Sequence, residues 1–317
     1  MENKNFNEVL KAREAAEKEN KAQEDTEYVA LDDTQRVKVL SPGRLVFNRF
    51  KRNKLAIVGM IVLILIIVVA IIGPLIAPYD YSAPDYAHRL QTPSKDHLLG
   101  TDNTGRDILS RLIIGARISL PIGFLCVIVA FAIGGTLGAL AAFYGGKVDM
   151  IVMRILDIFQ SIPPMLMAIA VVAVLGKGVQ NLVISIVISS LPARARIVRA
   201  SILTVKRNDY IESARAMGAS SKRQLIKYML PNALGPILTS FTFSVATAIL
   251  TISSLSYLGL GISEPSPEWG AMLSLGKTLI RTYPHVLLFP GLAIMITVLA
   301  LNLFGDGIRD ALDPRLK

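Results

Sequence analysis

The chain has 317 residues, of which 52% are hydrophobic and 18% charged, and its mean hydropathy is +0.49. A soluble domain normally carries about a quarter charged residues, so this composition argues against a soluble enzyme. Several uninterrupted apolar runs are long enough to cross a bilayer and indicate an all-α membrane protein with about six spans. The net charge of +10 does not indicate a nucleic-acid partner, because no recognised binding motif accompanies it. A single cysteine, Cys126, excludes an intrachain disulfide.

The N-terminal part divides into three predicted segments. Residues 1–35 are rich in Glu, Lys, Ala and Asn, which predicts a disordered or frayed cytoplasmic leader. Residues 36–54 mix apolar with basic side chains and favour an amphipathic helix on the membrane surface. The first apolar run begins only at Leu55, so residues 55–73 are predicted to be a retained span, ending at Gly73-Pro74, rather than a removable signal peptide.

The rest of the chain is predicted to form a transmembrane domain over residues 118–305. A long polar loop, 74–117, precedes this domain, and a polar tail, 306–317, follows it. Inside the domain lie a basic loop, 206–233, and a second long loop, 262–285. The apolar runs predict spans at 118–144, 151–175, 182–205, 234–260 and 286–304.

The basic clusters set the expected orientation. Lys and Arg are concentrated before the first span and within 206–233, so both segments are predicted to be cytoplasmic. With about six spans, both termini are then cytoplasmic, while the loops 74–117 and 262–285 are outside. Arg106, Arg111 and Arg117 oppose this orientation, but long loops follow the charge rule poorly.

The segment from Tyr210 to Leu234 is predicted to be a helix, a break and a second helix. Gly218 can adopt the positive φ that ends a helix, and Ser220 or Ser221 can cap the next one. Leu230-Pro231-Asn232 is expected to end the second helix and start the next span. A plain basic connector is the alternative, but this segment is longer than a connector requires.

The residues of this segment resemble a known motif, the "EAA" loop of ABC-importer permeases, with the pattern E-A-A-x3-G-x9-I-x-L-P. Two positions depart from it, Ser213 in place of an alanine and Tyr228 in place of the isoleucine. The resemblance implies that the segment docks on a cytoplasmic ATPase subunit. The expected coupling residues are Glu212, Ser213, Ala214, Ala216, Gly218, Leu230 and Pro231.

Three further segments widen the resemblance. "HLLGTDNTGRDILSRLIIGARISL", "SYLGLGI" and "GDGIRDALDP" are similar to the second permease subunit of oligopeptide, dipeptide and nickel importers. This resemblance implies a type I ABC importer permease fold and a multi-pass position in the cell membrane. It also implies a homologous permease partner, two ATPase subunits that hold ATP and Mg, and an extracytoplasmic binding protein. The chain itself would bind no cofactor and catalyse no reaction, and its cargo would be peptides, nickel or another small solute.

A stripe of hydroxyl side chains on one predicted helix face is a candidate wall of the transport path. The spacing of four, three, four and three residues places the members on one side of the helix. Tight packing between helices explains such a stripe equally well, so both readings stay open. The residues are Ser240, Ser244, Thr247, Thr251 and Ser254.

The loop before the second span holds a dense group of turn formers. An ordinary exposed loop is the simplest interpretation, and the family resemblance adds docking of the binding protein. The candidate docking residues are Gly100, Thr101, Asp102, Gly105, Arg106 and Asp107.

Other candidate sites are weaker. The stretch Trp269–Thr278 has five residues between its glycines where a phosphate-binding loop needs four, so it predicts no nucleotide site. The three histidines lack ligand-type spacing and are expected on the surface, which predicts no metal site. Asp157 is expected to pair with Arg154 one turn away. The spans have almost no mid-membrane carboxylates, which disfavours an ion-coupled transporter. Finally, Arg194, Arg196 and Arg199 are expected to reach lipid headgroups or to steady the coupling segment.

Overall fold

The structure is a computed structural model that describes residues 42–312. It consists of two units, Met1–Leu45 and Val46–Lys317, and of the first unit only residues 42–45 are described. The predicted leader, 1–35, and the end of the tail, 313–317, lie outside the described residues. Between residues 42 and 312 the regular structure is helical without strands, apart from an isolated β-bridge of Thr101 with Asp107. This confirms the all-α prediction.

The predicted surface helix, 36–54, is described only from residue 42 and ends at Phe50, and the first span is longer than expected. Helix α2 covers Pro42–Phe50, and α3 covers Lys54–Ile76 after a turn. The turn exists because the Asn53 side chain caps α3, accepting a hydrogen bond from the N–H of Ala56. The predicted end at Gly73-Pro74 is wrong, since Pro74 lies in the last turn, where its missing N–H removes only one helical hydrogen bond.

Helix α4, Ile108–Tyr144, begins ten residues before the expected start at 118 and shortens the predicted loop 74–117. Asp107 sets this start, because its carboxylate accepts a hydrogen bond of 2.7 Å from the N–H of Ser110. The 37 residues of α4 extend about 55 Å, well beyond a hydrocarbon core of about 30 Å. Its first turns therefore belong to the loop structure at one end of the bundle.

The predicted third span, 151–175, is wrong as a single straight helix. It consists of α5, Gly146–Gln160, and α6, Pro164–Leu175, which meet at an angle of 80°. The break is caused by Pro163-Pro164, because a residue before proline disfavours the helical conformation. Helix α7, Val179–Lys206, follows.

The coupling segment contains α8, Asp209–Ala216, then α9, Ser221–Arg223, and a π-helical turn η2, Gln224–Met229, which leads into α10, Leu230–Tyr257. The predicted helix end at Leu230-Pro231-Asn232 is wrong, because helix continues from Ser221 to Tyr257. Within η2 the hydrogen bonds reach back five residues, as from the N–H of Leu230 to the oxygen of Leu225. This wider turn precedes Pro231, so the proline can follow without ending the helix.

The second long loop contains a short helix, and the last span includes most of the predicted tail. Helix α11 covers Trp269–Gly276, and α12 covers His285–Leu312. The predicted tail from 306 is therefore wrong up to residue 312. Gly305 and Gly307 do not end the helix; they permit close packing, since a Cβ on Gly307 would lie 2.1 Å from the Cβ of Ala56.

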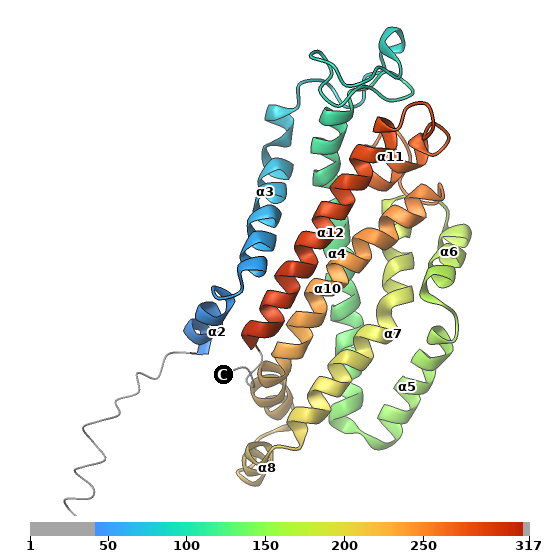
Figure 1. The fold of residues 1–317 in the computed structure, drawn as a ribbon. Coiled ribbons are helices and arrows are strands. Elements are labelled where there is room, and N and C mark those ends of the chain that lie inside the picture. Colours follow the sequence, from blue (N-terminus) through green and yellow to red (C-terminus); the bar gives the residue numbers. More distant parts are fainter. Residues whose placement is uncertain (1–41, 313–317) are drawn as a thin grey trace, which may run out of the picture. The chain divides into compact units, whose positions relative to one another are not determined.

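Helices α4, α7, α10 and α12 pack at the centre of the larger unit, with α3 on one side and α5 and α6 on the other (Figure 1). Glycines allow the closest of these contacts, because a Cβ on Gly138 of α4 would lie 2.1 Å from the oxygen of Ala195 in α7. Among the described residues, five helices are long and apolar enough to span a membrane, and the bent pair α5–α6 makes a possible sixth. The prediction of about six spans is confirmed.

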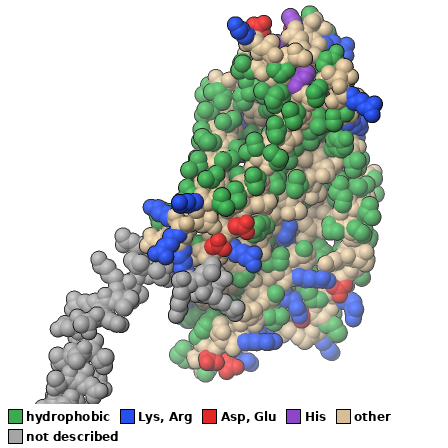
Figure 2. All heavy atoms as spheres, in the orientation of Figure 1, with side chains coloured by type: hydrophobic (Ala, Val, Ile, Leu, Met, Phe, Trp, Pro, Cys, Tyr) green, Lys and Arg blue, Asp and Glu red, His purple; other side chains and the backbone are tan. Residues whose placement is uncertain are grey.

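The surface of the larger unit matches a membrane environment. Figure 2 shows one face on which hydrophobic side chains form a broad continuous cover, with Lys, Arg, Asp and Glu gathered toward the two ends. The loop 77–107 and α11 lie at one end of the bundle, called the loop end below (Figure 1). Helix α8 lies at the opposite end, called the α8 end.

Candidate functional site

Helix α8 has one buried face and one exposed face. Ile211 and Ala214 are buried, and Ile211 belongs to a small apolar cluster formed with residues of α4, α7, η2 and α10. Glu212, Ser213 and Ala216 are exposed. The helix is therefore fixed to the bundle on one side and offers small and acidic side chains on the other. Ala214, which was also expected among the coupling residues, is buried and does not belong to this exposed face.

Gly218 ends α8 in the way the sequence predicted. Its φ is +79°, its N–H donates to the oxygen of Arg215, and the N–H of Ala219 donates to the oxygen of Ala214. These two bonds form a Schellman motif, which stops a helix by a left-handed glycine. Ser220 then caps the next helix by accepting from the N–H of Arg223.

The coupling segment is anchored to the membrane helices on both sides. Before it, Lys206 donates hydrogen bonds from Nζ to the carbonyl oxygens of Ala142 and Phe143 at the end of α4. After it, Leu230 packs against the apolar cluster that also holds Ile211, and Pro231 is exposed. Lys206 was not a predicted site residue; its position at the end of an apolar run was the only sequence signal.

Exposed apolar side chains surround the exposed face of α8. Met217 is 81% exposed, and Ile226 and Tyr210 are 53% and 42% exposed. These side chains lie at the α8 end, outside the apolar runs that predicted the spans. Large apolar side chains left in water commonly mark a contact site for another protein.

A cavity of about 400 Å³ lies among α4, α6, α7 and α10. Three residues of the predicted path line it, Ser244, Thr247 and Thr251. Ser254 is exposed beyond it, and Ser240 lines a separate cavity near Arg309. The stripe is thus divided, and only its middle part faces the cavity among α4, α6, α7 and α10.

Arg194 also lines this cavity, which the sequence did not predict. Its neighbours on α7 are paired with α5: Arg196 with Asp157 and Arg199 with Asp149, both at 2.5 Å. The predicted roles of Arg196 and Arg199 at headgroups or the coupling segment are therefore corrected to ion pairs between helices. The predicted pair of Asp157 with Arg154 is also wrong, because the bend after α5 brings α7 within reach of the carboxylate.

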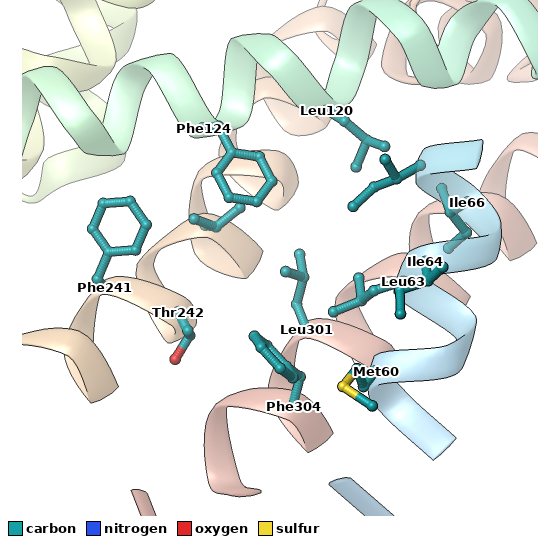
Figure 3. Close-up of a pocket in the computed structure, with 12 residues that line it drawn as sticks. Met60, Leu63, Ile64, Ile66, Leu120, Phe124, Phe241, Thr242, Leu301 and Phe304 are labelled. Atoms are coloured by element: carbon teal, nitrogen blue, oxygen red, sulfur yellow. The ribbon is translucent and has the colours of Figure 1, made fainter. Parts of the chain in front are cut away.

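A second cavity, of about 170 Å³, lies among α3, α4, α10 and α12 and differs in character. Figure 3 shows its lining of Leu, Ile and Phe side chains, among them Phe124 and Phe241. Its one hydroxyl, on Thr242, donates to the oxygen of Thr239. This cavity suits hydrocarbon, whereas the larger one beside Arg194 is also mainly apolar but includes one cation and several hydroxyls.

At the loop end, the predicted docking residues are buried, which corrects the expectation of an exposed loop. Asp102 is the centre: its carboxylate accepts from the N–H groups of Thr104 and Arg106 and from the Arg106 side chain at 2.7 Å. Arg111, in α4, lies 3.6 Å from the same carboxylate. The buried members are Gly100, Thr101, Asp102, Gly105, Arg106 and Asp107.

Two more buried carboxylates fix the loop end to the helices. Asp107 caps α4 and lies 3.0 Å from Nδ1 of His97. Glu268 caps α11 by accepting from the N–H groups of Gly270 and Ala271 at 2.9 Å. His285 is buried as well, so the prediction that all three histidines are surface residues is wrong for it.

The exposed surface near the predicted docking residues is a pocket of about 500 Å³. Four acidic residues line it together with His88 and His97. The N–H of Ser82 lowers the pKa of Asp80, and the hydrogen bond with His88 lowers the pKa of Asp85. The pocket is thus negatively charged at neutral pH. The docking residues predicted from the sequence are the buried residues that support this loop, and the exposed residues of the pocket were missed.

The sequence raised two further kinds of site, a metal centre and a phosphate-binding loop. No group of three or more His, Cys, Asp and Glu side chains in 42–312 is arranged to hold a metal ion. The stretch that superficially resembles a phosphate-binding loop begins with α11, whose Trp269 and Met272 are buried.

Comparison with known proteins identifies the family. A family model described as "Binding-protein-dependent transport system inner membrane component" matches residues 134–317, more than half of the chain. The chain belongs to this family of transport permeases. A second model, "N-terminal TM domain of oligopeptide transport permease C", matches residues 41–93. Membership implies that this permease works with ATPase and binding-protein subunits.

Curated relatives are similar in sequence over most of the chain. The dipeptide transport system permease protein DppC of Alkalihalophilus pseudofirmus is 44% identical over 278 residues, 88% of this chain and 91% of the relative. The glutathione transport system permease protein GsiD of Pectobacterium atrosepticum is 46% identical over 280 residues, 88% of this chain and 93% of the relative. The predicted family of peptide-importer permeases is confirmed.

Among solved structures, the methionine ABC transporter MetNI in an inward facing conformation is similar with a TM-score of 0.56. The match has 22% identity and covers 65% of this permease and 98% of the other chain. At this identity the likeness shows the fold alone, and it confirms the predicted type I ABC importer permease fold.

Proposed function

We propose that this permease forms half of the membrane path of an ATP-driven importer of di- or oligopeptides. A homologous but distinct permease would form the other half, two ATPase subunits would hold ATP and Mg, and an extracytoplasmic binding protein would deliver the peptide. The exposed face of α8, ended by Gly218 and anchored to the bundle, carries the coupling part of this proposal. The names of the relatives, which include dipeptide and glutathione transport systems, support the peptide cargo.

The proposed orientation of the permease in the membrane follows from its basic clusters. Both termini and the α8 end are placed in the cytoplasm, where the ATPases are found, and the loop end is placed outside. The acidic pocket beside the buried Asp102 network would then face the binding protein. Its docking surface would consist of exposed residues around Asp80 and Asp85 rather than of the buried scaffold.

The connections of α8 suggest how the nucleotide state of the ATPases reaches the path. Helix continues without interruption from Ser221 through η2 into α10, which carries Thr247 and Thr251 at the cavity. Lys206 ties the other side of the segment to α4. A displacement of α8 by the ATPases would therefore move α10 and α4 together, and differential ATPase contacts would select between two conformations. The chain itself would perform no bond chemistry.

An ion-coupled transporter is the main rival, and nickel or another small solute is the alternative cargo. Ion coupling usually requires a carboxylate inside the membrane that can gain and lose a proton or bind a cation. Here Asp149 and Asp157 are paired with arginines. Glu268 caps α11. These pairings favour ATP as the energy source.

The test is uptake of labelled trialanine into proteoliposomes that contain the complete complex, with binding protein outside. We expect accumulation to require ATP inside and both ATPase subunits, and to be unaffected by collapse of the proton gradient. Glu212→Lys should abolish uptake, because it reverses the charge on the docking face of α8. Asp306→Lys, the same charge change on an exposed residue of α12, is the matched control and should preserve uptake. Uptake driven by a proton gradient without ATP would refute the proposal.

A further inference from the structure

Arg194 has an unusual position for a charged residue. It lies fifteen residues after the start of α7 at Val179 and twelve before its end at Lys206. Along an α-helix these separations correspond to about 22 Å and about 18 Å. Arg194 is therefore near the middle of α7, which is long and apolar enough to span a membrane. A charge within a span normally faces a partner or a water-filled path.

The side chain of Arg194 has no anionic partner among the described residues. Its Nε is buried and makes no hydrogen bond there, and its guanidinium lies over the ring of Phe131, 5.5 Å from the centroid. The paired neighbours Arg196 and Arg199 show that α7 can hold its arginines in ion pairs. Arg194 differs from them because it faces the cavity instead of α5.

The remaining polar groups of the cavity are hydroxyls that already use their protons. Ser189 donates to Ile186 on α7, while Thr247 and Thr251 donate to Phe243 and Thr247 on α10, at 2.9–3.0 Å. Each hydroxyl oxygen keeps lone pairs that can still accept a hydrogen bond. The cavity wall is mainly apolar, with one unpaired cation and a few such hydroxyls.

We propose that Arg194 binds the C-terminal carboxylate of a peptide in transit, while the hydroxyls on α7 and α10 accept hydrogen bonds from its N–H groups. This inference rests on the proposed function as an importer. A carboxylate is the planar anion that a guanidinium recognises with two parallel hydrogen bonds. The volume of about 400 Å³ is within the range of small-ligand sites. With one charged contact and otherwise neutral acceptors, the site can hold a peptide without trapping it.

The experiment compares trialanine with its C-terminal amide as cargo for the complete complex in proteoliposomes. The wild-type complex should take up the acid with a higher kcat/KM than the amide. Arg194→Gln should lower the acid-to-amide ratio about tenfold or more, because a charge-assisted hydrogen bond is lost. Arg194→Lys should retain part of the preference. The same binding protein serves every variant, so any preference of its own cancels from the change in this ratio.

Arg196→Gln is the matched control, since it removes a charge two residues away that is already paired with Asp157. It should leave the acid-to-amide ratio at the wild-type value. An equal loss of both peptides in Arg194→Gln would overturn the proposal and indicate that Arg194 pairs with an acidic residue of the second permease. An unchanged ratio would overturn it as well.

Two further outcomes separate this proposal from the proposed function. If the wild-type complex accumulates neither peptide with ATP, the importer function fails rather than the Arg194 site. If Arg194→Gln does not insert, a trialanine analogue with a photoreactive C-terminal residue can be used on the wild-type complex. Crosslinks to 186–194 or 244–251 are expected, and crosslinks only elsewhere would contradict the site.

Discussion

The two ends of the bundle hold their charged residues in opposite ways. At the loop end, Asp102 and Arg106 are buried against each other, and Arg111 is buried beside them. At the α8 end, Glu212 and Arg215 of α8 are exposed, and no ion pair of either is recorded among the described residues. The anchoring of α8 depends instead on a small apolar cluster and on Lys206 at the adjoining helix ends.

This difference shows which surfaces are complete within one chain. A buried carboxylate with several donors is satisfied without another protein, so the loop end forms a rigid scaffold. The exposed side chains at α8, such as Met217 and Glu212, make few stabilising contacts with the rest of this chain. The helix has more to gain from a partner that covers its apolar groups and meets its charges. The buried charges of the loop end thus have their partners within this chain, whereas α8, where the ATPase is proposed to dock, leaves apolar and charged side chains exposed.

The largest effect is expected at the centre of the rigid end. Asp102→Ala leaves Arg106 and Arg111 buried without their carboxylate, and breaking a buried pair from one side costs about 3–5 kcal/mol. We expect a lower melting temperature of the purified permease and a loop that proteases cleave readily.

Asp96→Ala is the matched control, because Asp96 is an exposed carboxylate of the same loop. It should leave the melting temperature close to that of the wild type. If both variants melt alike, the contrast between the two ends does not come from the buried network.

A smaller effect is expected at the open end. Gly218→Ala has free space around the new Cβ but forces a non-glycine residue to a φ of +79°, which costs about 1–2 kcal/mol. Since the strain is local, the bundle should melt as the wild type does. The affinity for the ATPase pair, titrated against the permease in nanodiscs, should fall about tenfold.

Gly235→Ala tests whether any glycine near this end would behave in the same way. Gly235 lies in α10, has free space around it and has no positive φ. Its replacement should leave the affinity for the ATPases unchanged or slightly improved. An equal loss in both variants would show that the helix end at Gly218 is not what positions α8.

The features that sequence predicted well depend on local chemistry. Apolar runs gave the number of spans, and Gly218 with Ser220 gave the break in the coupling segment, because φ preference and capping act within a few residues. Helix ends were predicted less well where a cap or a proline was decisive. Asp107 started α4 ten residues early, and Pro163-Pro164 bent a span that apolar composition alone made continuous.

The candidate sites were harder to predict, because burial and pairing depend on residues distant in sequence. Asp102 and Arg106 look like a polar exposed turn, and only the packing of the loop on α4 makes them internal. Arg194, Arg196 and Arg199 look alike as a basic cluster. Only the fold distinguishes them: two carboxylates of α5, Asp157 and Asp149, pair with Arg196 and Arg199, whereas Arg194 faces the cavity.

The smallest effects are expected for the ion pairs between α5 and α7, which are less buried than the Asp102 network. Arg199 and Asp149 are 32% and 22% exposed and joined by two hydrogen bonds, while Arg196 and Asp157 are 44% and 46% exposed and joined by one. Exposed pairs contribute about 0–1 kcal/mol, and less as exposure rises. Arg199→Gln should therefore lower the melting temperature slightly and Arg196→Gln hardly at all. High salt should reduce the difference, because it screens partly exposed charges. A loss in Arg199→Gln as large as that in Asp102→Ala would mean that charges at the α8 end are as structural as those at the loop end.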